Sequence, residues 1–84
     1  MRYNDYNGWK NRETWSVSLW IANDYGLYTS AREFMNSYKG RKPYKDFIEY
    51  LYLEDEKNPD NIKWLSNKLD YRALNKFMND FKEM

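Results

Sequence analysis

The chain contains neither cysteine nor histidine. Without cysteine it has no disulfide, no thiolate nucleophile and no thiolate metal ligand. Without histidine it lacks the side chain that most often serves as a general base near neutral pH and as a metal ligand. These absences weigh against most hydrolases and against zinc chemistry. We therefore predict a protein that is not an enzyme and that needs no metal or other cofactor.

Long apolar runs and an excess of charge of one sign are also missing. No stretch approaches the ~18 apolar residues of a membrane span, and the N-terminal string MRYNDYNGW lacks the apolar middle of a signal peptide. We therefore expect a cytoplasmic protein without a membrane partner. The 14 Lys and Arg nearly balance the 13 Asp and Glu, which leaves a net charge of +1. This balance argues against a nonspecific polyanion binder and against an acidic mimic of DNA.

Aromatic residues are abundant for a chain of this size. The 84 residues are expected to form a single domain. They include four Trp, nine Tyr and four Phe, so that 20% of the chain is aromatic. The interior of so small a domain cannot hold all of these rings. Some of them must lie at the surface, where Tyr and Trp are typical binding anchors.

The first helix is the element with two competing interpretations. Residues 1–10 read as an N-terminal arm with a turn at Asn7–Gly8, which packs through Trp9. In the next segment, the apolar residues Trp15, Val17, Leu19 and Ile21 alternate with Ser16, Ser18 and Trp20, as in a half-buried strand. A helix fits the same residues, with Asn11 as its N-cap and Glu13 in its first turn. We favour the helix, because the cap and the length agree.

This helix has one apolar side that we predict to be core and a flank that we predict to meet a partner or the arm. The predicted core side carries Trp15, Leu19 and Ala22, with Ile21 nearby, and the flank carries Val17 and Trp20.

Three further helices follow from apolar residues at helical spacing. The second begins at a cap at Asn23 or at Ser30, is stopped by Gly40, and has the stripe Leu27, Ala31, Phe34, Met35 and Tyr38. The third begins at Pro43, frays at the acidic residues 54–56, and has the stripe Tyr44, Phe47, Ile48, Leu51 and Tyr52.

The last helix follows a turn at 58–60 and a short segment that is expected to fold onto the core through Ile62, Trp64 and Leu65. It is capped by Asp70 and continues through Leu74, Phe77, Met78 and Phe81. The predicted fold is all-α. It is a single small helical domain over residues 1–84, a bundle of about four helices with an irregular N-terminal arm at 1–10 and a loop around 54–68.

Two surfaces are candidates for binding. The string NRETW reads either as a solvated helix start or as a recognition patch for a protein, with the candidate residues Trp9, Arg12, Glu13 and Trp20. The turn between the second and third helices is basic, with Lys39, Arg41, Lys42 and Lys45 beside Tyr38 and Tyr44. It reads either as a solvated turn or as a nucleic-acid site with cations and stacking rings. The acidic group Glu54, Asp55, Glu56 and Asp60 reads as a solvated loop rather than a cation site.

The string GWKNRETWSVSLWIANDYGLY, residues 8–28, resembles a family of small uncharacterised proteins of bacteriophages and other mobile elements. Its hallmark is an N-R/W-E-T-W-x-V-x-L-W string followed by N-D-x-G/A-L-Y. The matching residues are Asn11, Glu13, Thr14, Trp15, Val17, Leu19, Trp20, Asn23, Asp24, Leu27 and Tyr28. A weaker similarity covers KLDYRALNKFM, residues 68–78. The resemblance implies an accessory protein in a bacterial host cytoplasm and no catalytic residues; small proteins of this kind often bind and redirect host machinery, including defence systems.

The sequence therefore leads to four hypotheses about function. The first is a binding module that inhibits or redirects a host or defence-system protein. The alternative is a nucleic-acid-binding module that uses the basic turn 39–45. A small enzyme that uses Asp, Glu or Tyr is the least favoured, and a homodimer is compatible with the first hypothesis.

Overall fold

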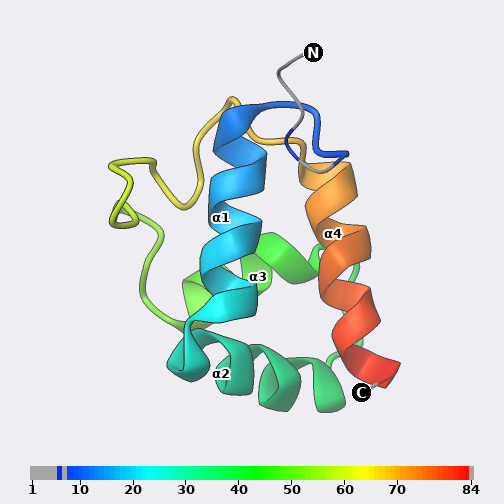
Figure 1. The fold of residues 1–84 in the computed structure, drawn as a ribbon. Helices are drawn as coiled ribbons and strands as arrows, with labels where there is room; N and C mark the ends of the chain where they lie inside the picture. The colour runs from blue at the N-terminus through cyan, green and yellow to red at the C-terminus, as the bar shows by residue number, and fades with distance from the viewer. Residues whose placement is uncertain (1–5, 7, 84) are drawn as a thin grey trace.

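The computed structural model describes Tyr6 and residues 8–83, and in this part of the chain it is a bundle of four α-helices (Figure 1). The helices are α1 Arg12–Asn23, α2 Tyr25–Asn36, α3 Pro43–Tyr50 and α4 Tyr71–Asn79, and a 3-10 turn, η1 Asp80–Glu83, continues α4. In Figure 1, α1 and α4 run alongside each other, α2 crosses beneath them and α3 lies behind. The segment 51–70, called loop 51–70 below, passes along the outer side of α1 and returns to the start of α4. The predicted all-α class is confirmed.

The helices begin at local signals, most of which the sequence predicted. The side chain of Asn11 accepts a hydrogen bond from the Thr14 N–H at 2.9 Å, and the side chain of Asp70 caps α4 in the same way. Pro43 is the first residue of α3, as predicted. The predicted caps of α2, Asn23 and Ser30, are wrong. Asn23 still belongs to α1, and the single extended residue Asp24 ends that helix while it caps α2.

The core lies where the inner sides of the helices meet loop 51–70. Its buried apolar residues are Val17, Ile21, Ala31, Met35, Tyr44, Phe47, Ile48, Ile62, Trp64, Leu69, Leu74, Met78 and Phe81. The predicted inner sides of the last three helices are confirmed apart from the exposed Tyr52, since part of each stripe is buried and the remaining residues are half-buried against the core, namely Leu27, Phe34, Tyr38, Leu51 and Phe77. The inward folding of Ile62 and Trp64 is confirmed as well. Leu65 is half-buried against the core.

The predicted core side of α1 is wrong. Val17, predicted to lie on the flank, is fully buried, whereas Trp15 and Leu19 are half-buried. Ala22 is exposed. The buried residues of α1 are Thr14, Ser16, Val17, Ser18 and Ile21, and three of these five are polar. Hydroxyl groups tolerate burial when they are hydrogen-bonded, and a pattern based on hydrophobicity overlooks such positions.

Two helices end earlier than predicted. α2 ends at Asn36 and not at Gly40, because Tyr38 lies outside the helix, where its hydroxyl forms two hydrogen bonds. The Tyr38 hydroxyl donates to the Asp46 carboxylate and accepts from the backbone N–H of Lys42 at 3.0 Å. A Cβ at Gly40 would overlap the Tyr38 phenol, so glycine makes room for this ring rather than stopping the helix.

α3 ends in a Schellman motif around Leu51. The N–H of Leu53 donates to the carbonyl of Ile48, and the N–H of Tyr52 donates to the carbonyl of Glu49, both at 3.0 Å. The position that glycine usually fills in this motif is occupied by Tyr52, with φ of 59°. The Tyr52 side chain is 84% exposed, so packing of its ring does little to offset the unfavourable backbone conformation.

The polar residues at the start of α1 fasten the end of loop 51–70. Asn11 donates from its side-chain amide to the carbonyl of Lys68 at 2.7 Å. The hydroxyl of Thr14, which is fully buried, donates to the Asn11 side chain at 2.6 Å and accepts from the N–H of Asp70 at 2.9 Å. The two helix caps, Asn11 and Asp70, are therefore joined through one hydroxyl group.

We expect Thr14→Val to lower the free energy of unfolding by about 2 kcal/mol, because the isosteric side chain leaves a partly buried N–H without its acceptor. Thr29→Val is the matched control: the Thr29 hydroxyl donates only to carbonyls of its own helix, and its loss should change stability by less than about 0.5 kcal/mol. Chemical denaturation of the three proteins measures the difference. Equal unfolding free energies for the two variants would show that the Thr14–Asp70 bond does not hold the loop.

We expect Tyr52→Gly to raise the free energy of unfolding by about 1 kcal/mol, since glycine adopts a left-handed backbone without steric cost. For a domain of this size this corresponds to an increase in Tm of roughly 4–8 °C. Asn61 also has a positive φ, 68°, but asparagine tolerates this conformation, so Asn61→Gly should stabilise less. A lower Tm for Tyr52→Gly would mean that the ring contributes more to folding than its exposure indicates.

Candidate binding site

Asp60 in loop 51–70 is the centre of the site on α1. Its Oδ2 atom accepts a hydrogen bond from the hydroxyl of Ser16 at 2.7 Å and another from the indole Nε1 of Trp20 at 3.0 Å. Ser16 is fully buried and Trp20 is half-buried. The carboxylate therefore holds the loop against α1 through two side chains one helical turn apart.

The turn that presents Asp60 is rigid because Asn58 fills its inside. Asn58 is 4% exposed, and its side-chain oxygen accepts from the N–H groups of Asp60 at 2.9 Å and Ile62 at 3.0 Å. Its amide nitrogen donates to the hydroxyl of Ser16 at 3.0 Å. Ser16 thus bonds to both sides of the turn, and the position of Asp60 follows from buried hydrogen bonds.

The pKa of the Asp60 carboxyl lies below its ordinary value. The hydrogen bond from Ser16 is the largest cause of the lowered pKa, and the hydrogen bond from Trp20 is the next. Partial desolvation raises the pKa, and the positive charge of Arg12 lowers it by a smaller amount. The group is therefore a carboxylate at neutral pH. It can accept hydrogen bonds and attract cations, but it does not supply a proton.

A hollow of about 330 Å³ lies in front of this carboxylate. Its lining residues are Arg12, Glu13, Asp60, Asn61, Ile62, Lys63, Ser66 and Lys68. Two of the four predicted protein-binding residues, Arg12 and Glu13, line it directly, and Trp20 is joined to it through Asp60. Both cations and carboxylates line the hollow, so its charge is not uniform.

The fourth predicted residue, Trp9, lies elsewhere. Its ring packs edge-on against Phe77 of α4, with 5.7 Å between ring centroids, and its N–H donates to the carbonyl of Tyr6 at 3.0 Å. Tyr6 in turn packs against Trp15 at 5.8 Å. The described part of the arm thus packs through Trp9, as predicted. Asn7 of the predicted turn lies outside the described residues, and Gly8 has the positive φ of 88° that a turn favours.

The sequence could not identify Asp60, Lys63 and Lys68 as neighbours of Arg12. Asp60 was grouped with Glu54, Asp55 and Glu56 as a solvated loop, and those three are indeed exposed. Asp60 is exposed too, but its carboxylate is bonded to Ser16, 44 positions away in the chain. No local pattern indicates a contact over that separation.

The structure brings together only part of the nucleic-acid site predicted at the basic turn. Lys39, Arg41, Lys42 and Lys45 are all exposed, and Lys45 pairs with Glu49 at 2.9 Å. The prediction of Tyr44 as a stacking ring is wrong: the ring is fully buried and its hydroxyl donates to the carbonyl of Trp64. Burial also raises the pKa of the Tyr44 phenol, which stays neutral.

The ring that shares a groove with Lys42 and Lys45 is instead that of the half-buried Tyr71. A groove of about 450 Å³ is lined by Lys42, Lys45, Leu65, Tyr71 and Asn75, where the start of α3 meets α4. Its wall is apolar at Leu65 and Tyr71, and its rim carries two ammonium groups. This α3–α4 groove brings together one half of the predicted basic cluster, Lys42 and Lys45.

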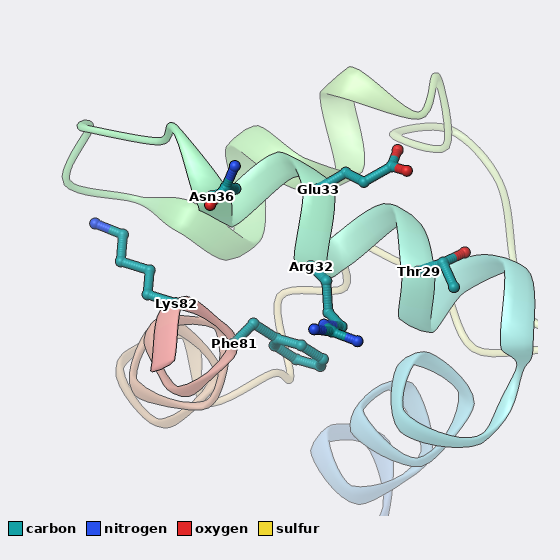
Figure 2. Close-up of a pocket in the computed structure, with 6 residues that line it drawn as sticks. All are labelled: Thr29, Arg32, Glu33, Asn36, Phe81 and Lys82. Carbon is teal, nitrogen blue, oxygen red and sulfur yellow. The ribbon is translucent and has the colours of Figure 1, made fainter. Parts of the chain in front are cut away.

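A further hollow, of about 320 Å³, lies between α2 and the C-terminal segment (Figure 2). Figure 2 shows Arg32 pointing toward the Phe81 ring, while Glu33 and Lys82 point away from it in different directions. Since its charged groups do not converge on a common point, this hollow has no evident ligand chemistry. Within the described residues, no three Cys, His, Asp or Glu side chains are grouped closely enough to hold a metal ion. No described helix is long and apolar enough to cross a bilayer.

We expect Asp60 to make stability depend on pH in the acidic range. Because the folded pKa lies below the ordinary 3.8, the carboxylate stabilises the fold above that value, and the contribution disappears as the pH falls through the folded pKa. Asp60→Asn should therefore lower the unfolding free energy at neutral pH and flatten its decline between about pH 5 and pH 2. Urea titrations at several pH values measure this, and parallel curves for the two proteins would contradict it.

The comparisons with known proteins give a family and no relative of known function. No curated protein and no solved structure gave a significant match. The model of a family of unknown function, DUF7249, matches residues 2–84. Because the match extends over nearly the whole chain, the protein belongs to the family DUF7249.

Proposed function

We propose that this protein is a non-enzymatic binding module that acts on another protein through the hollow at Asp60. The observation that supports this is the gathering of Arg12, Glu13, Trp20 and Asp60 around a turn that the buried hydrogen bonds of Asn58 fix. A surface that is already ordered loses little conformational entropy when it binds. The rigid turn therefore favours recognition.

The chemistry of the hollow suits a protein partner. Arg and Trp are enriched among the residues that dominate binding energies, and the exposed Arg12 guanidinium offers planar, bidentate hydrogen bonding. Carboxylates of Glu13 and Asp60 stand beside the cations Lys63 and Lys68. Such a mixed surface complements a polar protein segment with charges of both signs better than it complements a polyanion.

The resemblance of residues 8–28 supports a biological setting for this binding. We propose that the protein is an accessory protein of a phage or other mobile element, acts in the cytoplasm of a bacterial host, and inhibits or redirects a host or defence-system protein. The Asn-Arg-Glu-Thr-Trp string has two roles in this proposal. Asn11 and Thr14 hold the loop, and Arg12 and Glu13 face the partner.

The test is affinity capture from lysate of the bacterial host with quantitative mass spectrometry. We expect wild type to retain a defined protein, and Arg12→Ala to reduce its recovery at least about tenfold, the change that corresponds to ~1.4 kcal/mol of binding energy. Arg72→Ala is the matched control, since Arg72 is exposed on α4 and does not line the hollow. Recovery of the same proteins at the same level with both variants would contradict the proposal.

The α3–α4 groove supports nucleic-acid binding as the second candidate function. Lys42 and Lys45 there are close to Tyr71 and to the amide of Asn75, a combination of cations, a ring and hydrogen-bonding groups that single strands use. Binding of a labelled oligonucleotide that disappears in Lys42→Ala/Lys45→Ala, and that weakens steeply with salt, would favour this function over the first.

A further inference from the structure

The charges along α3 are arranged against the dipole of the helix. Exposed cations cluster before and within its first turn, namely Lys39, Arg41, Lys42 and Lys45, and exposed carboxylates follow toward and beyond its end, namely Glu49, Glu54, Asp55 and Glu56. A helix favours carboxylates at its N-terminus and cations at its C-terminus. Asp46 is the only described charge of α3 in the favoured place. Stability of this helix within one chain therefore does not explain the pattern.

The two ends of α3 also differ in apolar surface. At the acidic end, Tyr50 is 58% exposed and Tyr52 is 84% exposed. At the basic end lies the α3–α4 groove, with Leu65 and Tyr71 on its wall and Lys42 and Lys45 at its rim. Tyr50 packs against Phe34 of α2 at 5.0 Å between ring centroids, so Tyr52 is the more exposed ring beside these carboxylates, and the other end offers a partly apolar groove beside cations.

We infer that two copies of this chain associate through the exposed side of α3, with the helices antiparallel across a two-fold axis. In such an interface every contact occurs twice. If one residue of the first copy meets a given residue of the second copy, the same two residues also meet with the copies exchanged. The basic end of each α3 then lies against the acidic end of the other. A surface that carries opposite charges at its two ends is self-complementary in this arrangement and not in the parallel one.

The spacing of the residues supports a specific register. Lys42, Lys45 and Glu49 follow one another by three and four positions, so they share one side of the helix. An axis midway between positions 45 and 49 places Lys45 of one copy opposite Glu49 of the other. Together with the pairs within each chain, at 2.9 Å, this gives four alternating charges, and networks of this kind stabilise more than single exposed pairs.

The same axis accounts for Tyr52. Lys42 lies just before the first residue of α3 and Tyr52 lies two residues beyond the last, so the antiparallel arrangement brings Tyr52 of one copy toward Lys42 and the α3–α4 groove of the other. There the ring would meet Leu65 and Tyr71 and the ammonium groups of the lysines, which interact favourably with aromatic faces. A tyrosine held at φ of 59° and directed to solvent then has a role that glycine could not fill.

The experiment is sedimentation velocity of the full chain over a concentration series, with the single variants Lys45→Glu and Glu49→Lys. We expect wild type to dimerise and to dissociate as salt screens the charges. Each reversal places two like-charge contacts across the axis and should raise the dimer dissociation constant at least about tenfold. An equimolar mixture of the two variants should dimerise again, because one chain then carries two carboxylates at these positions and the other chain two ammonium groups.

The controls separate this interface from other effects of charge and stability. Lys76→Glu and Glu33→Lys change the charge by the same amounts on α4 and α2 and should leave the dimer unchanged. Tyr52→Gly should weaken the dimer while the monomer becomes more stable, and Asn61→Gly should not weaken it. Circular dichroism shows that each variant is folded.

A wild type that stays monomeric up to about 1 mM would overturn the inference, since its dissociation constant would then exceed the range in which the charge network and the Tyr52 contact contribute measurably to association. A dimer unaffected by the single reversals, or a mixture that fails to dimerise, would overturn it as well and would show that α3 meets a different surface. Lys45, Glu49 and Tyr52 do not line the Asp60 hollow, so this inference and the proposed action on another protein can fail independently.

Discussion

Hydrogen bonds between the polar side chains of α1 and loop 51–70 are the constraint on which the rest of the structure depends. The loop has no helix or strand of its own, yet it supplies Ile62, Trp64 and Leu69 to the core. Long segments without regular structure are unfavourable in small domains unless side chains fix them. Thr14 and Ser16 do so at Asp70 and Asp60, and both hydroxyls are fully buried. The core of this protein is therefore closed by polar contacts on one side.

The same contacts shape the candidate site, because the loop that they hold forms most of the hollow. Arg12 and Glu13 lie in the first turn of α1, between Asn11 and Thr14, which form hydrogen bonds to the loop. Their side chains line the hollow because of that position. In the proposed function, folding and binding would be coupled within one short string. Part-buried Asn11–Thr14 hydrogen bonds position the backbone, and the side chains of Arg12 and Glu13 between them line the hollow. Such a division within consecutive residues follows from helical geometry, since neighbours in sequence point in different directions.

The sequence was sufficient for the features that are local. Asn11, Asp70 and Pro43 were identified because a cap or a first helical residue is a relation over three or four positions. It was insufficient where the partner lies far away. The inward side of α1 depends on hydroxyl bonds across 44 and 56 positions, so Val17 was placed outside and Trp15 and Ala22 inside. Tyr44 was expected to stack with ligands, but its hydroxyl finds the Trp64 carbonyl inside the core.

The interior cannot hold all of the aromatic rings, and among the described residues the most exposed rings are those of tyrosines and not of tryptophans. Trp64 is buried and Trp9, Trp15 and Trp20 are half-buried, whereas the highly exposed rings are Tyr25, Tyr50 and Tyr52. A phenol retains its hydroxyl in water, so exposure is less unfavourable for it than for indole. Tyr52 nevertheless has an additional cost, since its backbone is in a conformation that suits glycine. In the dimer inferred above, contacts of the exposed Tyr52 ring with the second copy would offset this cost.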